Sequence, residues 1–294
     1  MKNMLKYNQK EEFRMCKLLF DLTSRERALN SLSMFIGRKE GEICSIINRN
    51  CFDDNLNYRD IQDILLEELD IDEDELSLED IEIKSIHVTT GNNDEEFRKN
   101  GLLNLREVLR RDTTMSRFLH DEGIKIDIEN KLIEYKDKKY SISNEDENNF
   151  VYHKLFNDYL INGFHCDENP IDYDGLVAFR PEFINELGKL IKNPKLQYDW
   201  KMKFNKCYLI EYKTNPYNYE WFNYQIDSLN SKEEFESDMD YYIKRWLIRS
   251  AIVVIIEDIK GMGLPEIFSY ARFNYNFSSD EILKITDVTN KRIN

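Results

Sequence analysis

The chain has 294 residues, 41% of them hydrophobic and 13% aromatic, which is typical of a chain that folds around a core. Its formal net charge of −15 excludes a general nucleic-acid binder, because 56 acidic side chains repel phosphate, and it is compatible with a basic protein partner. The longest apolar run, residues 251–256, is far shorter than the roughly 18–20 residues of a membrane span, so no membrane insertion is expected.

Cysteine usage and the first residues indicate a reducing compartment. The five cysteines are odd in number and form no C-x-x-C pair, so neither a disulfide scaffold nor a structural zinc site is expected. Residues 1–8 have neither the apolar core nor the cleavage site of a signal peptide. We therefore expect a cytoplasmic protein whose thiols are free and buried.

Residues 1–80 are predicted to form a helical N-terminal region. Tyr58, Ile61, Leu65 and Leu69 recur at helical spacing. The dense acidic run at residues 70–80 is expected to be an exposed connector. We place a boundary there and expect residues 81–294 to form the main domain.

Residues 81–90 alternate between apolar and polar side chains, which predicts an interior strand that ends in His87-x-Thr89. A polar turn follows, then a short helical stretch at residues 95–99 that closes on Gly101, then a second helix. We expect His87 to line a cleft at the end of this strand, where sheet proteins commonly hold ligands. The alternative is a strand-end histidine that bonds a loop.

The rest of the main domain mixes helices and strands. Thr113 or Thr114 caps one helix, and Pro181 begins another. Residues 124–142 suggest a hairpin or meander, a polar loop follows at residues 143–149, and residues 207–213 and 268–277 suggest strands. Ser231 starts a long helix that we extend through residues 251–256. The prediction is an α+β fold with a central, largely antiparallel sheet.

Three further features have competing interpretations. Arg106 and Arg110 share a helix face. This face is interpreted either as a basic patch or as an ordinary solvated surface. His165 and Cys166 are neighbours, but adjacent residues rarely face each other, so neither a Cys–His nucleophile nor a metal site is expected. The aromatic side chains of the central region suit stacking on a base or nicotinamide, and they suit a core equally well.

His87-x-Thr89, the short helix and Gly101-Leu102 together resemble the opening block of the ADP-ribosyltransferase fold. The later strand at residues 268–277 and the acidic turn after it are similar to the end of that fold. The resemblance implies NAD as cofactor, with His87, Thr89 and Gly101 at the nicotinamide ribose. It also implies a late glutamate that stabilises the positive charge on the ribose, for which Glu211, Glu257 and Glu266 are the candidates.

Two functional hypotheses follow. The first is an NAD-dependent ADP-ribosyltransferase-like protein, active or degenerate. The second is a non-catalytic, acidic interaction protein that binds a protein partner through its acidic surface and helical N-terminal region. The chain is rich in Lys, Ile and Asn and poor in Ala, which suggests an AT-rich genome and suits a mobile element or host-defence setting for either hypothesis.

Overall fold

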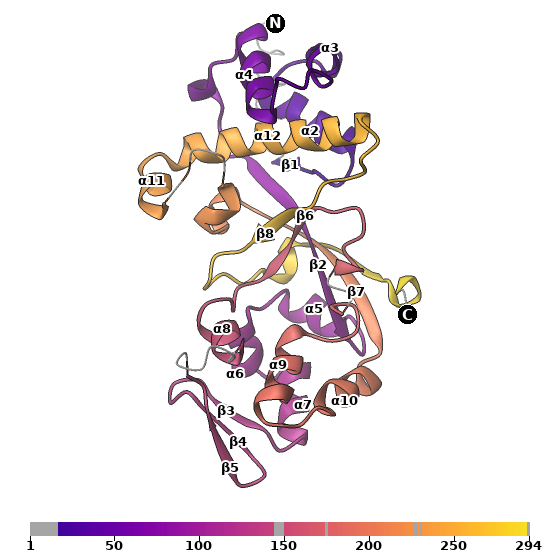
Figure 1. Ribbon diagram of the computed structural model, residues 1–294, viewed down its shortest axis with the longest axis vertical. Coiled ribbons are helices and arrows are strands. Elements are labelled where there is room, and N and C mark those ends of the chain that lie inside the picture. The colour runs from indigo at the N-terminus through magenta and orange to yellow at the C-terminus, as the bar shows by residue number, and fades with distance from the viewer. Residues whose placement is uncertain (1–16, 144–149, 174–175, 226–228, 230, 293–294) are drawn as a thin grey trace, which may run out of the picture. The chain divides into compact units, whose positions relative to one another are not determined.

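The computed structural model describes residues 17–143, 150–173, 176–225, 229 and 231–292 (Figure 1). Helices and a mostly antiparallel sheet make up these residues, so the expected α+β class is confirmed. Most of the polar loop expected at residues 143–149 lies outside the described residues.

The chain divides into two compact units. The first unit comprises Met1–Ser85, His165–Glu168 and Lys213–Phe268, and the second comprises Ile86–Phe164, Asn169–Tyr212 and Ser269–Asn294. This division differs from the expected boundary near residue 80, because later segments return to the N-terminal helices. Local hydrophobic periodicity does not predict contacts between segments that are so far apart in the sequence.

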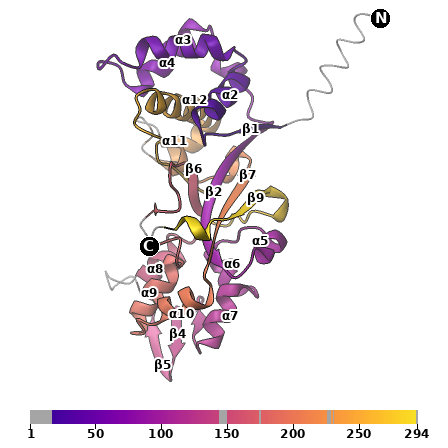
Figure 2. The same cartoon turned by 90° about the vertical axis from the view of Figure 1, so that its right-hand side faces the viewer.

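Helices dominate the first unit. Its elements are β1 (Leu18–Phe20), α2 (Arg25–Ile36), α3 (Glu40–Asn50), α4 (Tyr58–Glu68), η1 (Glu73–Glu75), η3 (Pro216–Asn218), η4 (Trp221–Tyr224), α11 (Lys232–Ser237) and α12 (Met239–Ile259). Helix α12 contacts α2, α3 and α4, and these helices lie together in both Figure 1 and Figure 2. The helical character expected for the N-terminal region is confirmed for its described residues.

Residues 70–80, which we call the acidic segment, contain η1 and are mostly exposed. Several side chains in it are anchored to the first unit, among them those of Leu78 and Glu73. Leu78 is buried in the core of the first unit, and the Glu73 carboxylate pairs with Arg245 of α12 at 3.0 Å. The expected exposure of the segment is therefore confirmed for most of its residues.

Helix α12 contains residues 251–256, as expected, and most of its residues are buried. The long helix expected to begin at Ser231 is interrupted. The Ser231 hydroxyl accepts a hydrogen bond from the Glu234 amide at 3.1 Å and caps α11. Asp238 then leaves the helical region, with φ −149° and ψ 60°, so α11 and α12 are separate helices.

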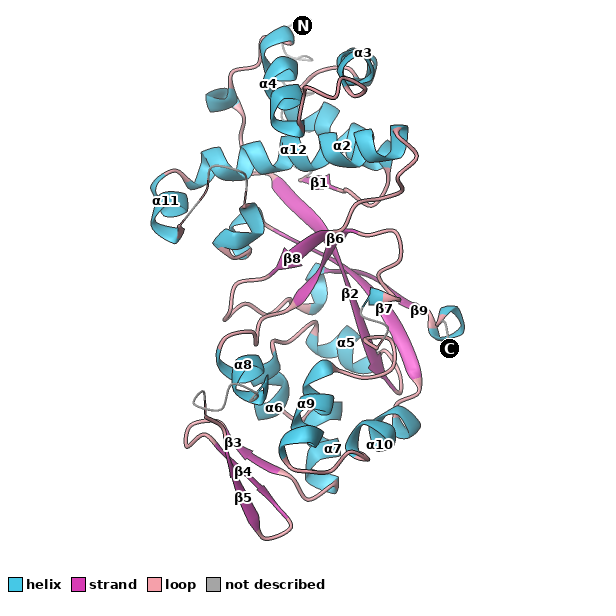
Figure 3. Cartoon of the chain, viewed as in Figure 1, coloured by secondary structure: helices cyan, strands magenta, loops and turns pink. Residues whose placement is uncertain are grey.

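The second unit combines short helices with a three-stranded sheet and part of the main sheet (Figure 3). Apart from strands shared with the first unit, its elements are α5 (Glu95–Asn100), α6 (Leu105–Arg110), α7 (Thr114–Asp121), β3 (Lys125–Asp127), β4 (Leu132–Tyr135), β5 (Lys138–Ser141), α8 (Phe150–Phe156), α9 (Glu182–Leu190), α10 (Leu196–Lys203), η5 (Ser279–Glu281), β9 (Ile282–Asp287) and η6 (Thr289–Lys291). Strands β3, β4 and β5 form the expected antiparallel meander.

The main sheet contains the strand expected at residues 81–90. Its order is β8-β6-β2-β7-β9, with β2 (Ile81–Gly91) flanked by β6 (Asn162–Cys166) and β7 (Lys206–Thr214), so the prediction of an interior strand is confirmed. Strand β1 pairs with β2 in parallel, whereas β2 with β6 and β7 with β9 pair antiparallel. Strands β2, β6, β7 and β8 (Ile267–Tyr270) contribute residues to both units.

Strand β8 is shorter than the strand expected at residues 268–277. After Tyr270 the chain turns, and the Tyr275 amide donates to the Arg272 carbonyl at 2.8 Å. Phe277 then forms an isolated antiparallel bridge with Leu102. The alternation of aromatic and polar residues therefore marks a strand, a turn and a bridge rather than one strand.

Candidate functional site

A pocket with a volume of about 200 Å³ lies in the second unit at the end of β2. It is lined from the end of β2, from α5 and the loop that follows it, and from α6, α7 and α10. Its polar lining side chains are His87, Thr89, Thr90, Asn93, Glu96, Asn100 and Thr114. The expected cleft beside His87 is therefore present, and Thr89 and Gly101 line it as well.

The His87 ring is held in one tautomer. Its Nδ1 lies 2.7 Å from the Asn162 carbonyl oxygen, which can only accept, so Nδ1 carries the hydrogen. Burial lowers the pKa of His87 below its usual value, so the ring is neutral at pH 7. Nε2 then presents a lone pair, and it has no hydrogen-bond partner in the part of the chain that the structure describes.

The two threonines after His87 differ in their surroundings. Thr90 is buried, and its hydroxyl accepts a hydrogen bond from the indole Nε1 of Trp200 at 2.9 Å. Thr89 is half-buried and lines the pocket, and its hydroxyl bonds no other described residue. Thr89 is therefore the residue that can offer a hydroxyl to a ligand, while Thr90 fixes one wall.

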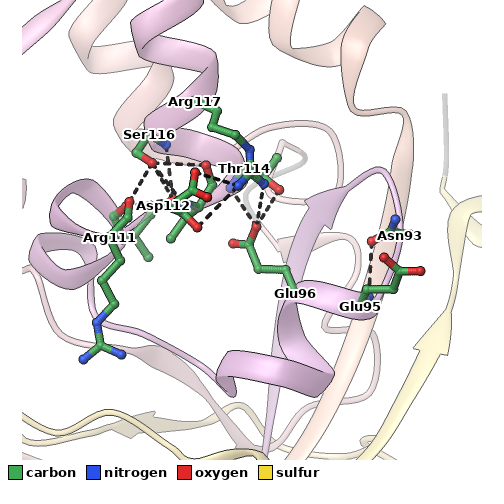
Figure 4. Close-up of polar contacts among 10 residues, drawn as sticks. Asn93, Glu95, Glu96, Arg111, Asp112, Thr114, Ser116 and Arg117 are labelled. Atoms are coloured by element: carbon green, nitrogen blue, oxygen red, sulfur yellow. Dashed lines mark hydrogen bonds and ion pairs between the residues drawn. The ribbon is translucent and has the colours of Figure 1, made fainter.

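Glu96 supplies the carboxylate of the pocket (Figure 4). Its Oε2 accepts from both the amide and the hydroxyl of Thr114, each at 2.7 Å, at the start of α7. The Arg117 guanidinium lies 3.4 Å from the same oxygen. Sequence reasoning missed Glu96, because the stretch at residues 95–99 indicated only a short helix.

Gly101 meets a steric requirement of this fold. Its backbone has φ 71° and ψ −150°, a conformation that is essentially restricted to glycine. A Cβ atom here would lie 1.8 Å from the carbonyl oxygen of Phe277. The amides and carbonyls of Leu102 and Phe277 exchange two hydrogen bonds of 2.9 Å directly beside it. The pocket wall therefore depends on Gly101 whatever the pocket binds.

Apolar side chains complete the lining. Among them are two aromatic residues, Phe97 and Trp200, and the aliphatic Leu102, Met115 and Ile161. Trp200 also packs edge-on against Phe118, with ring centroids 5.1 Å apart. The pocket thus combines apolar side chains with several polar groups, which is the usual composition of small-molecule sites.

The three candidate glutamates are not among the described residues that line the pocket. Glu211 lies on β7 with its carboxylate 4.0 Å from the Lys284 ammonium. Glu257 lies on α12 and accepts a hydrogen bond from the Tyr58 hydroxyl. Glu266 is exposed just before β8, and both Glu257 and Glu266 belong to the first unit. Among the described residues that line the pocket, the carboxylate is that of Glu96.

His165 and Cys166 are buried in the first unit. The His165 ring lies 3.0 Å from the Ser85 hydroxyl and 3.2 Å from the Asn223 side chain, and burial lowers its pKa to about 4. Burial also raises the pKa of the Cys166 thiol to about 12, so it is not a nucleophile near neutral pH. These residues lie in a buried cluster in which the His165 ring contacts Ser85 and Asn223.

The two arginines on α6 also have protein partners. Arg106 Nε donates to the Leu155 carbonyl at 2.7 Å, and its guanidinium lies 4.0 Å from the Tyr159 ring centroid. Arg110 donates to the Glu129 carboxylate at 2.8 Å. The interpretation as a basic patch is therefore less well supported than that of an ordinary helix surface.

Comparison with known proteins identifies no relative: no family model, curated protein or solved structure matches the chain. Among the described residues, no cluster of three or more His, Cys, Asp or Glu side chains is arranged to hold a metal ion. No helix in the same residues combines the length and the apolar character that crossing a membrane requires. The functional argument therefore depends on the pocket and its residues.

Proposed function

We propose that this chain is an ADP-ribosyltransferase-like protein that binds the nicotinamide riboside end of NAD in the pocket at the end of β2. The observation that supports the proposal most is the convergence of His87, Thr89 and Glu96 on one pocket. The volume of about 200 Å³ is below the roughly 300–1,000 Å³ typical of sites for drug-sized ligands. One end of the dinucleotide would therefore enter, and the remainder would lie outside.

Each polar residue has a role in this proposal. The lone pair on His87 Nε2 accepts a hydrogen bond from a ribose hydroxyl, because Nδ1 already donates to Asn162. The Thr89 hydroxyl bonds the same sugar. Phe97 and Trp200 contribute apolar surface for the nicotinamide ring. Transfer would need an anion near the ribose carbon as nicotinamide leaves, and Glu96 is the carboxylate in the pocket.

Calorimetric titration of the full chain with NAD tests this function. His87→Ala removes one hydrogen bond in a buried polar site, which costs about 1–3 kcal/mol, or roughly 5- to 150-fold in affinity. His120→Ala is the matched control, because His120 is highly exposed on α7 and does not line the pocket. Nicotinamide release is measured in parallel. Absence of binding at millimolar NAD, or equal affinity in both variants, contradicts the proposal.

We also propose, as the second candidate, that the protein binds a basic partner through its acidic segment. The exposure of Asp72, Asp74, Glu75, Glu79 and Asp80 supports this function. Binding to polylysine should weaken steeply with salt and weaken further when these acids become amides. Affinity that is independent of salt and of the substitutions contradicts it.

A further inference from the structure

Among the described residues that line the pocket, Glu96 is the only side chain with a formal charge at pH 7. This described lining contains neither lysine nor arginine, and burial keeps His87 neutral. A phosphate or carboxylate group would therefore meet a carboxylate and find no cation among these residues. An anionic ligand loses its hydration there without gaining a charged partner.

The neighbouring Arg117 does not fully neutralise the Glu96 carboxylate. The nearby Arg117 guanidinium is also 2.8 Å from the Asp112 carboxylate, and its side chain is 54% exposed (Figure 4). Two carboxylates therefore share one guanidinium, which leaves a net charge of about −1 in this cluster. Arg117 itself does not line the pocket.

The orientation of the carboxylate also matters. All the hydrogen bonds from Thr114 and Arg117 reach Oε2. Oε1 has no hydrogen-bond partner among the described residues, and it is not a buried orphan atom. One oxygen thus fixes the side chain against α7, while the other remains available to a ligand.

We infer that Glu96 makes this pocket selective for a cationic ring, such as the pyridinium of oxidised nicotinamide, over its neutral counterpart, and keeps phosphate groups outside. Phe97 and Trp200 favour the same ligand class, because aromatic faces attract organic cations. The inference deepens the proposed function by naming the charge of the group that enters. It concerns the lining itself, so it can be tested without the dinucleotide.

The test compares two probes of nearly equal shape, the permanent cation 1-methylnicotinamide and neutral nicotinamide, titrated calorimetrically into the full chain. The cation should bind at least about tenfold more tightly, because a pair of opposite charges about 4 Å apart contributes more than about 1.4 kcal/mol even at the effective dielectric constant of a protein surface. Glu96→Gln should bring the two affinities within about twofold. The amide keeps an oxygen that can accept from Thr114, and a thermal unfolding scan checks the fold.

Glu95→Gln is the matched control. Glu95 is the neighbouring acid on the same helix, and it is exposed and outside the pocket lining (Figure 4). This variant should keep the tenfold preference. Equal affinity of the wild type for the two probes, failure of both to bind at millimolar concentration, or an unchanged preference in Glu96→Gln overturns the inference. A cation preference without NAD binding supports the inference and removes the proposed function. NAD binding without the cation preference supports the proposed function and overturns the inference.

Discussion

Replacing Gly101 with alanine should destabilise the second unit severely, because two independent costs arise at one position. The alanine must adopt φ 71° and ψ −150°, and its Cβ must avoid a carbonyl oxygen that would lie 1.8 Å away. That oxygen belongs to Phe277 and accepts the hydrogen bond from the Leu102 amide. The clash therefore acts directly on the bridge that joins these two segments.

The magnitude follows from these two costs. The backbone conformation costs about 1–3 kcal/mol for a residue with a side chain. Displacing Phe277 weakens two hydrogen bonds of 2.9 Å, each of which contributes about 0.5–1.5 kcal/mol. The expected loss in the free energy of unfolding is thus about 2–6 kcal/mol, a large part of the stability of a typical domain.

Urea-induced unfolding followed by circular dichroism measures this loss. Gly123→Ala is the control, since Gly123 has the same φ of 71°, whereas a Cβ added there would meet no described atom within 4 Å. The control should lose only about 1–2 kcal/mol from the left-handed backbone. If Gly101→Ala is no less stable than Gly123→Ala, the close approach of Phe277 does not limit this position and the reasoning is refuted.

Two further outcomes are expected. Burial lowers the pKa of His165 to about 4, below its value near 6.5 in the unfolded chain. The contribution of the neutral His165 ring to the stability of the fold is therefore complete above pH 6.5 and is lost as the pH falls toward 4. The free energy of unfolding should therefore fall by about 2–3 kcal/mol more between pH 7 and pH 4.5 in the wild type than in His165→Gln, and equal slopes would contradict this. Trp200→Phe and Thr90→Val should couple by about 0.5–1.5 kcal/mol in a double-mutant cycle of unfolding, since each removes one partner of the same 2.9 Å hydrogen bond, and additive losses would contradict it.

Local patterns predicted the elements that depend on local physics. Alternation predicted β2, and its polar end placed His87 beside a pocket. Thr113 was expected as a possible cap, and its hydroxyl accepts from the Ser116 amide at 3.1 Å. The β-branched run at residues 251–256 was the hardest case, and burial of most of α12 explains why its composition resembles that of a strand.

Long-range contacts escaped the same reasoning. Glu96 and Thr114 are 18 residues apart, and only the fold places the start of α7 against that carboxylate. Ser85 and Tyr219 are 134 residues apart, yet their hydroxyls lie within 2.7 Å. The search for a late glutamate depended on the family resemblance rather than on the fold of this chain. It therefore gave Glu211, Glu257 and Glu266 as candidates, and the carboxylate of Glu257 accepts a hydrogen bond from Tyr58.

A crystal structure of the protein grown with saturating NAD tests the central claim most directly. We expect electron density for the nicotinamide ring beside Glu96, with a ribose hydroxyl within hydrogen-bond distance of His87 Nε2 and the phosphates outside the pocket. Density for the dinucleotide at another surface, or a phosphate group against Glu96, would contradict the assignment of this pocket as a site for the nicotinamide riboside end of NAD.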